Sequence, residues 1–407
     1  MKIKFAYGIA ATVLCIVIYV LLFLTASAPE KTIRLPFKKV RIGVLSKYGL
    51  RQLSMHIKNG RLFINGNTYA LQDETIFIQI DKSTIAVSVL SVSSKKMKYT
   101  TNHLILESNA SILVAWKEQQ SRRFSGSLEV DIIHNKLNLI NETDVESYIS
   151  STAHGELGSL VGKLKDEAHK QTLLRTIKVA IRSYLFHNQN RHKDENFHLC
   201  DLTHCMYFPG MLKKTEPGDF PVEVLLKDDN EILSAYFHST CGSNLTGPDV
   251  YWKNHSSEKY YRQGKDSLFL GNEMLCEDSP HYRWEAVISK PKINEILGTK
   301  ITGKVQLNVE NGRVSSLIYF DENRIQQKIS ISSFLSKAGR NLGWNRIKSN
   351  DFTMEQNASF YIIRGKGLGH GVGMCQWGAM RQASMGKTYD EILEFYFPNA
   401  RLVTGTY

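Results

Sequence analysis

Hydrophobic and polar positions alternate over much of the first third of the chain, in short runs. The alternation is clear at 40–44, 61–64, 75–80 and 83–87. A period of two is typical of strands with one buried face. Asn59-Gly60 and Asn65-Gly66-Asn67 are turn signals between such runs. We therefore predict a β-rich N-terminal domain over 30–127, and a hairpin at 127–140 that leads into a second domain.

The period of the pattern changes at residue 144. Apolar residues then fall at helical spacing over 144–157, and more clearly over 167–186. Strand patterns follow at 222–226, 232–238, 284–288, 305–309 and 315–320. A helical pattern at 374–383 precedes Thr388 and Glu391, which form a capping-box signal for a last helix through 395. We predict a mixed α+β domain over 128–403, so that the expected fold class is α+β.

The N-terminus has a different pattern. Residues 5–25 are 21 positions without a charge, preceded by Lys2 and Lys4. This length matches a helix that crosses a bilayer, whereas the apolar part of a signal peptide is usually about 7–15 residues long. We expect a cytoplasmic tail at 1–4, a transmembrane anchor at 5–25 and a single-pass protein whose other domains are extracytoplasmic. Ala26-Ser27-Ala28 resembles a cleavage site, so cleavage after Ala28 would give a secreted protein.

Composition adds one constraint. Hydrophobic residues make up 42% and charged residues 22% of the 407 positions, which is typical of globular proteins and argues against disorder. The formal net charge of +12 favours polyanionic partners, but it also fits a solvated surface, because the basic residues are scattered. An extracytoplasmic position disfavours nucleic acid as the partner.

A glycine-rich segment at 364–379 is the first candidate for chemistry. No Gly-Lys-Ser/Thr ends it and its glycine spacing does not fit G-x-G-x-x-G, so it is neither a P-loop nor a dinucleotide fingerprint. So many glycines indicate left-handed backbone or close approach of a ligand. His370, Gln376 and Trp377 offer an imidazole, an amide and an indole suited to sugar recognition. A tight structural turn before a helix is an equal alternative.

The same segment carries a resemblance to a known family. Gly367-x-Gly369-His370-Gly371-Val372-Gly373-Met374-x-Gln376-Trp377-Gly378-Ala379 resembles the closing signature of the SpoIID/LytB family. Three further blocks agree with the family in order: 141–149 followed by Glu156, 180–184, and 237–242 with 250–252. The resemblance runs from about 128 to 403. One departure is Glu156-Leu157-Gly158, where many relatives have Glu-Met-Pro.

The resemblance implies a lytic transglycosylase that acts on peptidoglycan glycan strands, in particular strands stripped of stem peptides. Glu156 matches the family's catalytic glutamate, which protonates the glycosidic oxygen and then deprotonates the muramyl C6 hydroxyl, closing a 1,6-anhydro ring. This chemistry requires no cofactor. Residues expected at the substrate are Arg182, Ser183, Tyr184, His238, Ser239, His370, Gln376 and Trp377. The alternative is a non-catalytic wall-binding protein that enhances a partner amidase. Sporulation, division and wall turnover all remain open as the process served.

A cysteine and histidine cluster forms the second candidate. Cys200, His204 and Cys205 match a segment that binds zinc in some family members, and His192 is expected as the fourth ligand because His198 lies only two residues before Cys200. We expect a structural Zn²⁺ there, with a Cys200–Cys205 disulfide as the alternative. Cys241 and Cys276 form a further candidate pair, although the sequence does not give their separation.

Overall fold

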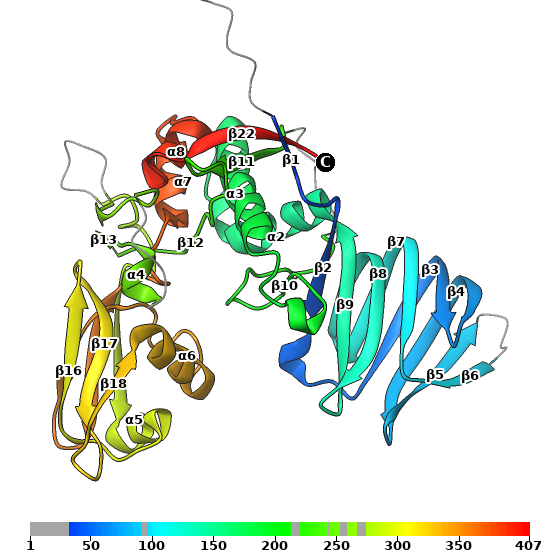
Figure 1. Ribbon diagram of the computed structural model, residues 1–407, viewed down its shortest axis with the longest axis horizontal. Coiled ribbons are helices and arrows are strands. Elements are labelled where there is room, and N and C mark those ends of the chain that lie inside the picture. The colour runs from blue at the N-terminus through cyan, green and yellow to red at the C-terminus, as the bar shows by residue number, and fades with distance from the viewer. Residues whose placement is uncertain (1–31, 92–95, 213–219, 243, 253–258, 267–273) are drawn as a thin grey trace, which may run out of the picture.

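The computed structural model describes residues 32–91, 96–212, 220–242, 244–252, 259–266 and 274–407. Within them the chain forms three bodies (Figure 1): a large sheet, a helical body beside it, and a smaller mixed body. Residues near the two ends of the described chain are adjacent, because β1 (Ile33–Arg34) pairs in parallel with β22 (Arg401–Thr406). Strand β11 (Glu223–Leu226) completes that sheet on the other edge of β22.

The large sheet contains nine strands in the order β10-β2-β9-β8-β7-β3-β4-β5-β6. All neighbours are antiparallel except β10 and β2. The strands are β2 (Lys39–Val44), β3 (Gln52–Ile64), β4 (Asn67–Asp81), β5 (Thr84–Ser91), β6 (Lys96–Thr101), β7 (Leu104–Lys117), β8 (Gln120–Ile133), β9 (Lys136–Asp144) and β10 (Leu199–Cys200). Alternate residues of β3 are buried, as the period of two predicts.

The two turn signals have different outcomes. Asn65 and Gly66 both have positive φ and connect β3 to β4 by two residues, which confirms that turn. Asn59-Gly60 is not a turn: it lies inside β3, where the register against β7 shifts between Ile57 and Gly60. The irregularity is a β-bulge in the facing strand β7, where the stretch from Ser108 to Ile112 is one residue longer than the stretch from Ile57 to Gly60 that it opposes.

The helical body contains α2 (Val145–Val161), α3 (Glu167–His187), α7 (Gln376–Ser384) and α8 (Tyr389–Tyr396). These helices confirm the helical patterns in the sequence, and Thr388 and Glu391 form the predicted capping box at the start of α8. The apolar stripe of α3 is buried, and it packs against α2, α7 and β11. The segment predicted as a strand at 232–238 is mostly irregular, with only β12 (Phe237–His238) extended against β21 (Met374–Cys375).

The smaller body spans 283–366 and has its own hydrophobic core. It contains β15 (Arg283–Ser289), α5 (Lys290–Leu297), β16 (Thr302–Glu310), β17 (Arg313–Phe320), β18 (Gln326–Ser330), α6 (Ile331–Leu342), β19 (Asp351–Gln356) and β20 (Phe360–Lys366). Its two ends are adjacent, because Arg283 pairs with Lys366 in the register of β15 and β20. The body is therefore inserted between the blocks at 237–252 and the glycine-rich segment, which continues at 367.

The predicted fold class and location need correction. Over the residues that the structure describes, no helix is long and apolar enough to cross a membrane. The longest of them, α3, is amphipathic and carries charges such as Lys170, Arg175 and Arg182. The described chain is also richer in strand than in helix. The predictions of a transmembrane α+β protein and of single-pass membrane location are therefore wrong for the described chain. The tail at 1–4, the anchor at 5–25 and the cleavage site at Ala28 lie outside the described residues.

Candidate functional site

Glu156 lies near the C-terminal end of α2, at a local break in the helix. Asp144 caps the start of α2 by accepting a hydrogen bond from the Ser147 amide at 2.9 Å. Two residues after Glu156 the helix is interrupted at Gly158, where φ is 24° and ψ is −96°. A backbone angle in this region favours glycine. The helix thus bends directly after the glutamate, at the point where the sequence departs from the common family pattern.

Two donors hold the Glu156 carboxylate. The backbone amide of Tyr207 donates to Oε1 at 2.6 Å, and Nε2 of Gln376 donates to Oε2 at 3.4 Å. Burial raises the pKa of Glu156 above its ordinary value, and the two hydrogen bonds oppose that rise. The environment therefore favours the protonated acid while also supplying donors for the carboxylate.

The Tyr207 donor belongs to a loop that packs tightly on α2. A side chain at Gly155 would place its Cβ 2.8 Å from Cδ of Pro209 and 3.0 Å from the Tyr207 carbonyl oxygen. The glycine at position 155 therefore permits the loop at 207–209 to approach α2 closely enough for the Tyr207 amide to reach Glu156.

The Gln376 donor is the first residue of α7. Cys375 caps this helix, with its sulfur accepting from the Gly378 amide at 3.4 Å. Trp377 is buried, its amide donates to the Ser239 carbonyl at 3.2 Å, and Lys163 lies 5.3 Å from the centre of its indole ring. The structure thus brings Gln376 to Glu156, whereas the ring of Trp377 is covered.

His238 and His370 form an aromatic group with Tyr236, Tyr251 and Trp252. The rings of His238 and His370 are 5.4 Å apart, and Trp252 lies 4.9 Å from His370. Burial lowers the pKa of His370 to about 3 and holds the pKa of His238 well below its ordinary value. Both imidazoles are therefore neutral at ordinary pH and act as hydrogen-bonding groups rather than as cations.

The three residues on α3 that are expected to contact the substrate lie in the interior of the protein. Arg182 is buried and donates to Glu146 at 2.6 and 3.1 Å and to the Glu223 carbonyl at 3.0 Å. Ser183 donates to the Val179 carbonyl and accepts from the Leu225 amide. Tyr184 is buried against Tyr236. These partners fit a structural role, and contact of Arg182, Ser183 and Tyr184 with a substrate stays a prediction.

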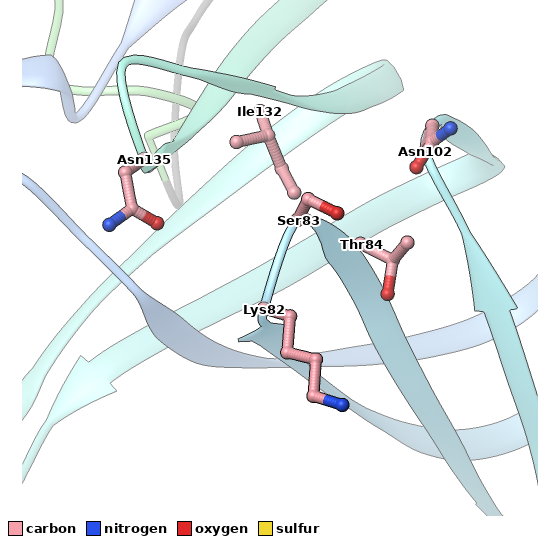
Figure 2. A pocket seen from close by; sticks show the side chains of 6 residues that line it. All are labelled: Lys82, Ser83, Thr84, Asn102, Ile132 and Asn135. Carbon is pink, nitrogen blue, oxygen red and sulfur yellow. The ribbon is translucent and has the colours of Figure 1, made fainter.

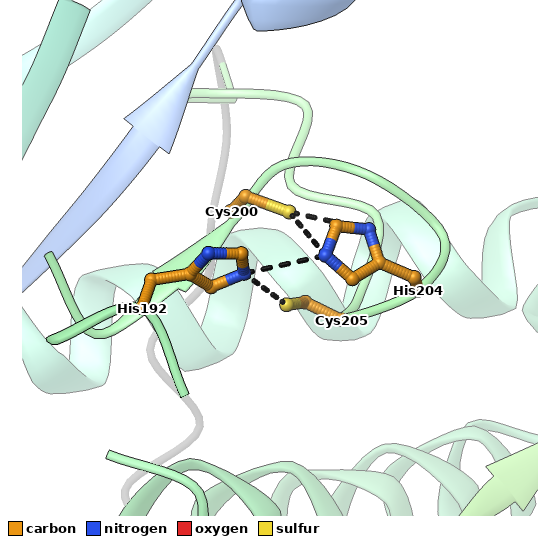
Figure 3. Close-up of side chains that lie close together, drawn as sticks. All are labelled: His192, Cys200, His204 and Cys205. Atoms are coloured by element: carbon orange, nitrogen blue, oxygen red, sulfur yellow. Dashed lines mark hydrogen bonds between the residues drawn. The ribbon is translucent and has the colours of Figure 1, made fainter. Parts of the chain in front are cut away.

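His192, Cys200, His204 and Cys205 form a compact group (Figure 3). Their ligand atoms all lie within 4.8 Å of one another. Nε2 of His192 lies 3.4 Å from Cys205 Sγ and 3.2 Å from His204 Nε2, and Cys200 Sγ lies 3.5 Å from His204 Nε2. His198 is excluded from the group, because its Nδ1 accepts from the Arg41 amide and its ring stacks on Phe37.

The donor set of this group fits a metal ion. Two sulfurs and two imidazole nitrogens at these separations match the edges of a tetrahedral site, which for bonds of about 2.0–2.3 Å are about 3.3–3.8 Å. Glu195 contacts the other ring nitrogen of His192 at 3.0 Å, an arrangement typical of the second shell of a metal site. Cys200 and Cys205 are both free thiols here. The group is therefore able to bind a metal.

Some relevant residues were not identified from the sequence. The Tyr207 donor is a backbone amide, which no residue type reveals. A second set of ligand atoms, from Cys241, Asp266, Cys276 and Cys375, gathers residues that are up to 134 positions apart. The odd number of cysteines beyond the N-terminal segment was the only signal for a use of cysteine other than pairing.

A hollow on the nine-stranded sheet lies apart from these residues. Figure 2 shows the side chains that line it, near the ends of strands. Its volume is about 630 Å³. The lining residues are Lys82, Ser83, Thr84, Asn102, Ile132 and Asn135. They supply no carboxylate or imidazole, and none of them is among the predicted site residues.

Comparison with known proteins supports the resemblance. No family model matches the chain. It is 40% identical over 178 residues to "Amidase enhancer" of Bacillus subtilis (strain 168), a match that covers 42% of this chain and 24% of that protein. It is 25% identical over 182 residues to "Stage II sporulation protein D" of the same organism, covering 44% and 47%. An uncharacterised protein of Brachyspira hyodysenteriae is 23% identical over 293 residues, covering 69% and 72%.

The match is partial for each of the relatives with functional names. The chain spans about a quarter of the amidase enhancer and about half of stage II sporulation protein D. A second stage II sporulation protein D, from Bacillus amyloliquefaciens, matches at 25% identity over 173 residues. Taken with the ordered motifs from 141 to 379, these partial matches support the assignment of the chain to the SpoIID/LytB family.

Proposed function

We propose that the chain acts on the bacterial cell wall as a lytic transglycosylase, with Glu156 as its acid and base. The observation that carries this proposal is the environment of Glu156, where burial favours the protonated acid and two donors favour the carboxylate. A lytic transglycosylase needs one group in both states, first as an acid and then as a base. The resemblance to the SpoIID/LytB family supports a glycan strand as the substrate.

In this mechanism protonated Glu156 donates its proton to the oxygen between two sugars. The bond from that oxygen to the anomeric carbon breaks, and positive charge develops at the anomeric carbon and ring oxygen. The Glu156 carboxylate then accepts the proton of the muramyl C6 hydroxyl, whose oxygen bonds to the anomeric carbon. The products are a free hydroxyl on one fragment and a 1,6-anhydro end on the other, so that no water is consumed.

The other residues of the site have supporting parts in this proposal. The amides of Tyr207 and Gln376 stabilise the carboxylate form between the two proton transfers. The aromatic group around His370 offers ring faces and neutral imidazoles for sugar hydroxyls. His238, Ser239 and His370 lie next to the segment that holds Gln376, which supports a role for them in positioning the strand.

We also propose a structural Zn²⁺ at His192, Cys200, His204 and Cys205. Four protein ligands leave no position for water, so the ion would stabilise the fold rather than take part in the reaction. It would hold the segment that ends two residues before Tyr207, whose amide reaches Glu156. Elemental analysis should therefore find zinc in the purified chain and less of it in a Cys200→Ser, Cys205→Ser variant. The same zinc content in both proteins would count against this assignment.

A second function is supported by the match to a protein named "Amidase enhancer". In that case the aromatic group and Gln376 would bind glycan strands without cleaving them, and an amidase would be a partner. Purified protein should be incubated with peptide-free glycan strands and with strands that keep their stem peptides. Products with anhydro ends support the transglycosylase, and hydrolysed ends indicate a muramidase. Binding of strands without any cleavage would support the amidase-enhancing function and would contradict the catalytic proposal.

A further inference from the structure

Three cysteine thiols and one aspartate carboxylate lie together in the interior, as a group separate from His192, Cys200, His204 and Cys205. Sγ of Cys241 lies 3.4 Å from Sγ of Cys276 and 3.0 Å from Oδ2 of Asp266. Together with Sγ of Cys375, these ligand atoms all lie within 4.8 Å of one another. All four residues are 0% exposed. Burying a carboxylate is costly unless a cation or hydrogen bonds compensate for it, and a cation would also favour the thiolate forms of the three cysteines.

The surroundings of these four residues resemble those of a metal site. The hydroxyl of Tyr396 donates to Oδ1 of Asp266 at 3.1 Å, which leaves Oδ2 directed at the sulfurs. The sulfur of Cys375 accepts from two backbone amides, those of Cys241 and Gly378, each at 3.4 Å. Amide donors to sulfur favour the thiolate, and a hydrogen bond to the outer oxygen orients a ligating carboxylate.

The glycine at position 378 permits this arrangement. A Cβ there would lie 2.0 Å from the Tyr396 hydroxyl and 2.9 Å from Oδ2 of Asp266. Cys375 also caps α7, so its sulfur lies at the N-terminus of a helix, where negative charge is stabilised. The backbone amides of Cys241 and Gly378 and the N-terminus of α7 thus all favour a negative charge on the Cys375 sulfur.

The separations fit a tetrahedral ion. Sulfur ligands at about 2.3 Å from Zn²⁺ are about 3.8 Å from one another, and a carboxylate oxygen lies slightly closer. The sulfurs of Cys241 and Cys276 are farther apart than the roughly 2.05 Å of a disulfide bond. Thiolates with one carboxylate select zinc over the harder cations Ca²⁺ and Mg²⁺.

We propose that Cys241, Asp266, Cys276 and Cys375 form a second, structural zinc site. It joins the segment that follows β12, the residues at 266 and 276, and the start of α7. Gln376 directly follows the ligand Cys375, and its amide is one of the two donors to Glu156. The other donor, Tyr207, follows Cys205 of the first group by two residues. Each donor to Glu156 is thereby fixed next to one metal group.

The test uses the full chain carrying Cys200→Ser and Cys205→Ser, so that the first group does not contribute. This protein should retain one zinc per chain by elemental analysis. With Co²⁺ in place of zinc, its sulfur-to-metal absorption band should fall by about a third when Cys276→Ser is added. Ser279→Ala is the matched control, because the Ser279 hydroxyl is buried nearby and bonds Thr240, next to Cys241, but is not one of the four ligands. It should leave zinc content unchanged.

A milder variant keeps the proposal testable if the cysteine variants fail to fold. Tyr396→Phe removes only the hydrogen bond to Asp266 and should weaken zinc affinity about 10–100-fold in competition with a chelator. Absence of zinc from the Cys200→Ser, Cys205→Ser chain would overturn the proposal. So would unchanged zinc affinity in Tyr396→Phe, or recovery of a peptide pair linked by a Cys241–Cys276 disulfide. None of these outcomes depends on whether the chain cleaves glycan.

Discussion

At the scale of single residues, the protonation of Glu156 depends on a balance between burial and two hydrogen bonds. Burial is the largest influence and raises the pKa, whereas the Tyr207 amide and the Gln376 side chain lower it. A general acid loses its proton as pH rises through its pKa, so the rate should fall on the alkaline side. Because the pKa of Glu156 is raised, we expect the enzyme to stay active to a higher pH than it would with an ordinary glutamate.

Replacing Gln376 with leucine should shift the alkaline limit, which is the pH at which the cleavage rate begins to fall, to a higher value. The substitution removes a donor to the carboxylate, so the pKa of Glu156 rises further and the protonated acid persists to higher pH. The pH dependence of kcat/KM on peptide-free strands should show the fall in rate at higher pH in Gln376→Leu than in the unmodified chain. Gln382→Leu is a control on the same helix, since Gln382 is buried but does not contact Glu156. A limit that stays in place or moves to lower pH would contradict this reading of the site.

At the scale of elements, the approach of the 207–209 loop to α2 is set by Gly155. Alanine at this position would bring Cβ within 2.8 Å of Pro209 and push the loop away from the helix. We expect Gly155→Ala to cost roughly 1–3 kcal/mol of stability through overpacking and to reduce activity, because the Tyr207 donor moves. Chemical denaturation and the cleavage assay measure the two effects.

Gly162 provides the matched control at the end of the same helix. It has φ of −65°, and an added Cβ would lie no closer than 3.6 Å to a neighbouring atom. Gly162→Ala should therefore be neutral or stabilise the protein by roughly 0.5–1 kcal/mol. Equal losses in the two alanine variants would show that the loop contact at Gly155 has no special importance.

Local patterns were sufficient to predict many elements, but not the contacts between them. Thr388 and Glu391 predicted the start of α8, because a capping box involves only neighbouring residues. Asn59-Gly60 was misread as a turn, because a bulge depends on the partner strand. Arg182 was expected at the substrate, yet its partner Glu146 and the Glu223 carbonyl lie on other elements that no local pattern specifies.

The site itself was predictable only through the family. No neighbour of Glu156 in the sequence marks it as an acid, and both of its donors come from distant segments, 51 and 220 positions away. The His192 group was predictable because its ligands lie within 14 positions of each other. The Cys241 group was not, because its ligands meet only in the fold. The domain limits of 30–127 and 128–403 stay a prediction, and so do the roles of the substrate residues.

At the scale of the whole molecule, Arg313 connects the inserted body to Cys241 and Asn244, and it packs against Gly371 of the glycine-rich segment. It is buried and donates to the carbonyls of Cys241 and Asn244 and, at 2.7 Å, to Oδ1 of Asn350. A Cβ at Gly371 would lie 2.3 Å from its Cζ, so the glycine there leaves room for the guanidinium. Tyr251 packs against both hydrophobic cores, and the hydrogen bonds of Arg313 add a polar connection between the two bodies.

Arg313→Met should uncouple the inserted body from the rest. The acceptors left without donors should cost about 3 kcal/mol or more, and calorimetry should show two transitions where the unmodified chain shows one. Arg364→Met is the control within the inserted body, because Arg364 forms only exposed ion pairs with Glu285 and Glu355 and should cost less than about 1 kcal/mol. A single transition in both variants would argue against a bridging role for Arg313.

The central claim is that Glu156 cleaves glycan strands without water. The most direct measurement is the mass of the products formed from peptide-free strands by the unmodified chain and by Glu156→Gln. We predict muramyl ends lighter by one water, as 1,6-anhydro rings require, and a rate about 10²–10⁴-fold lower in Glu156→Gln with strand binding retained. Anhydro products formed equally fast by Glu156→Gln, or no cleavage by the unmodified chain, would contradict the account.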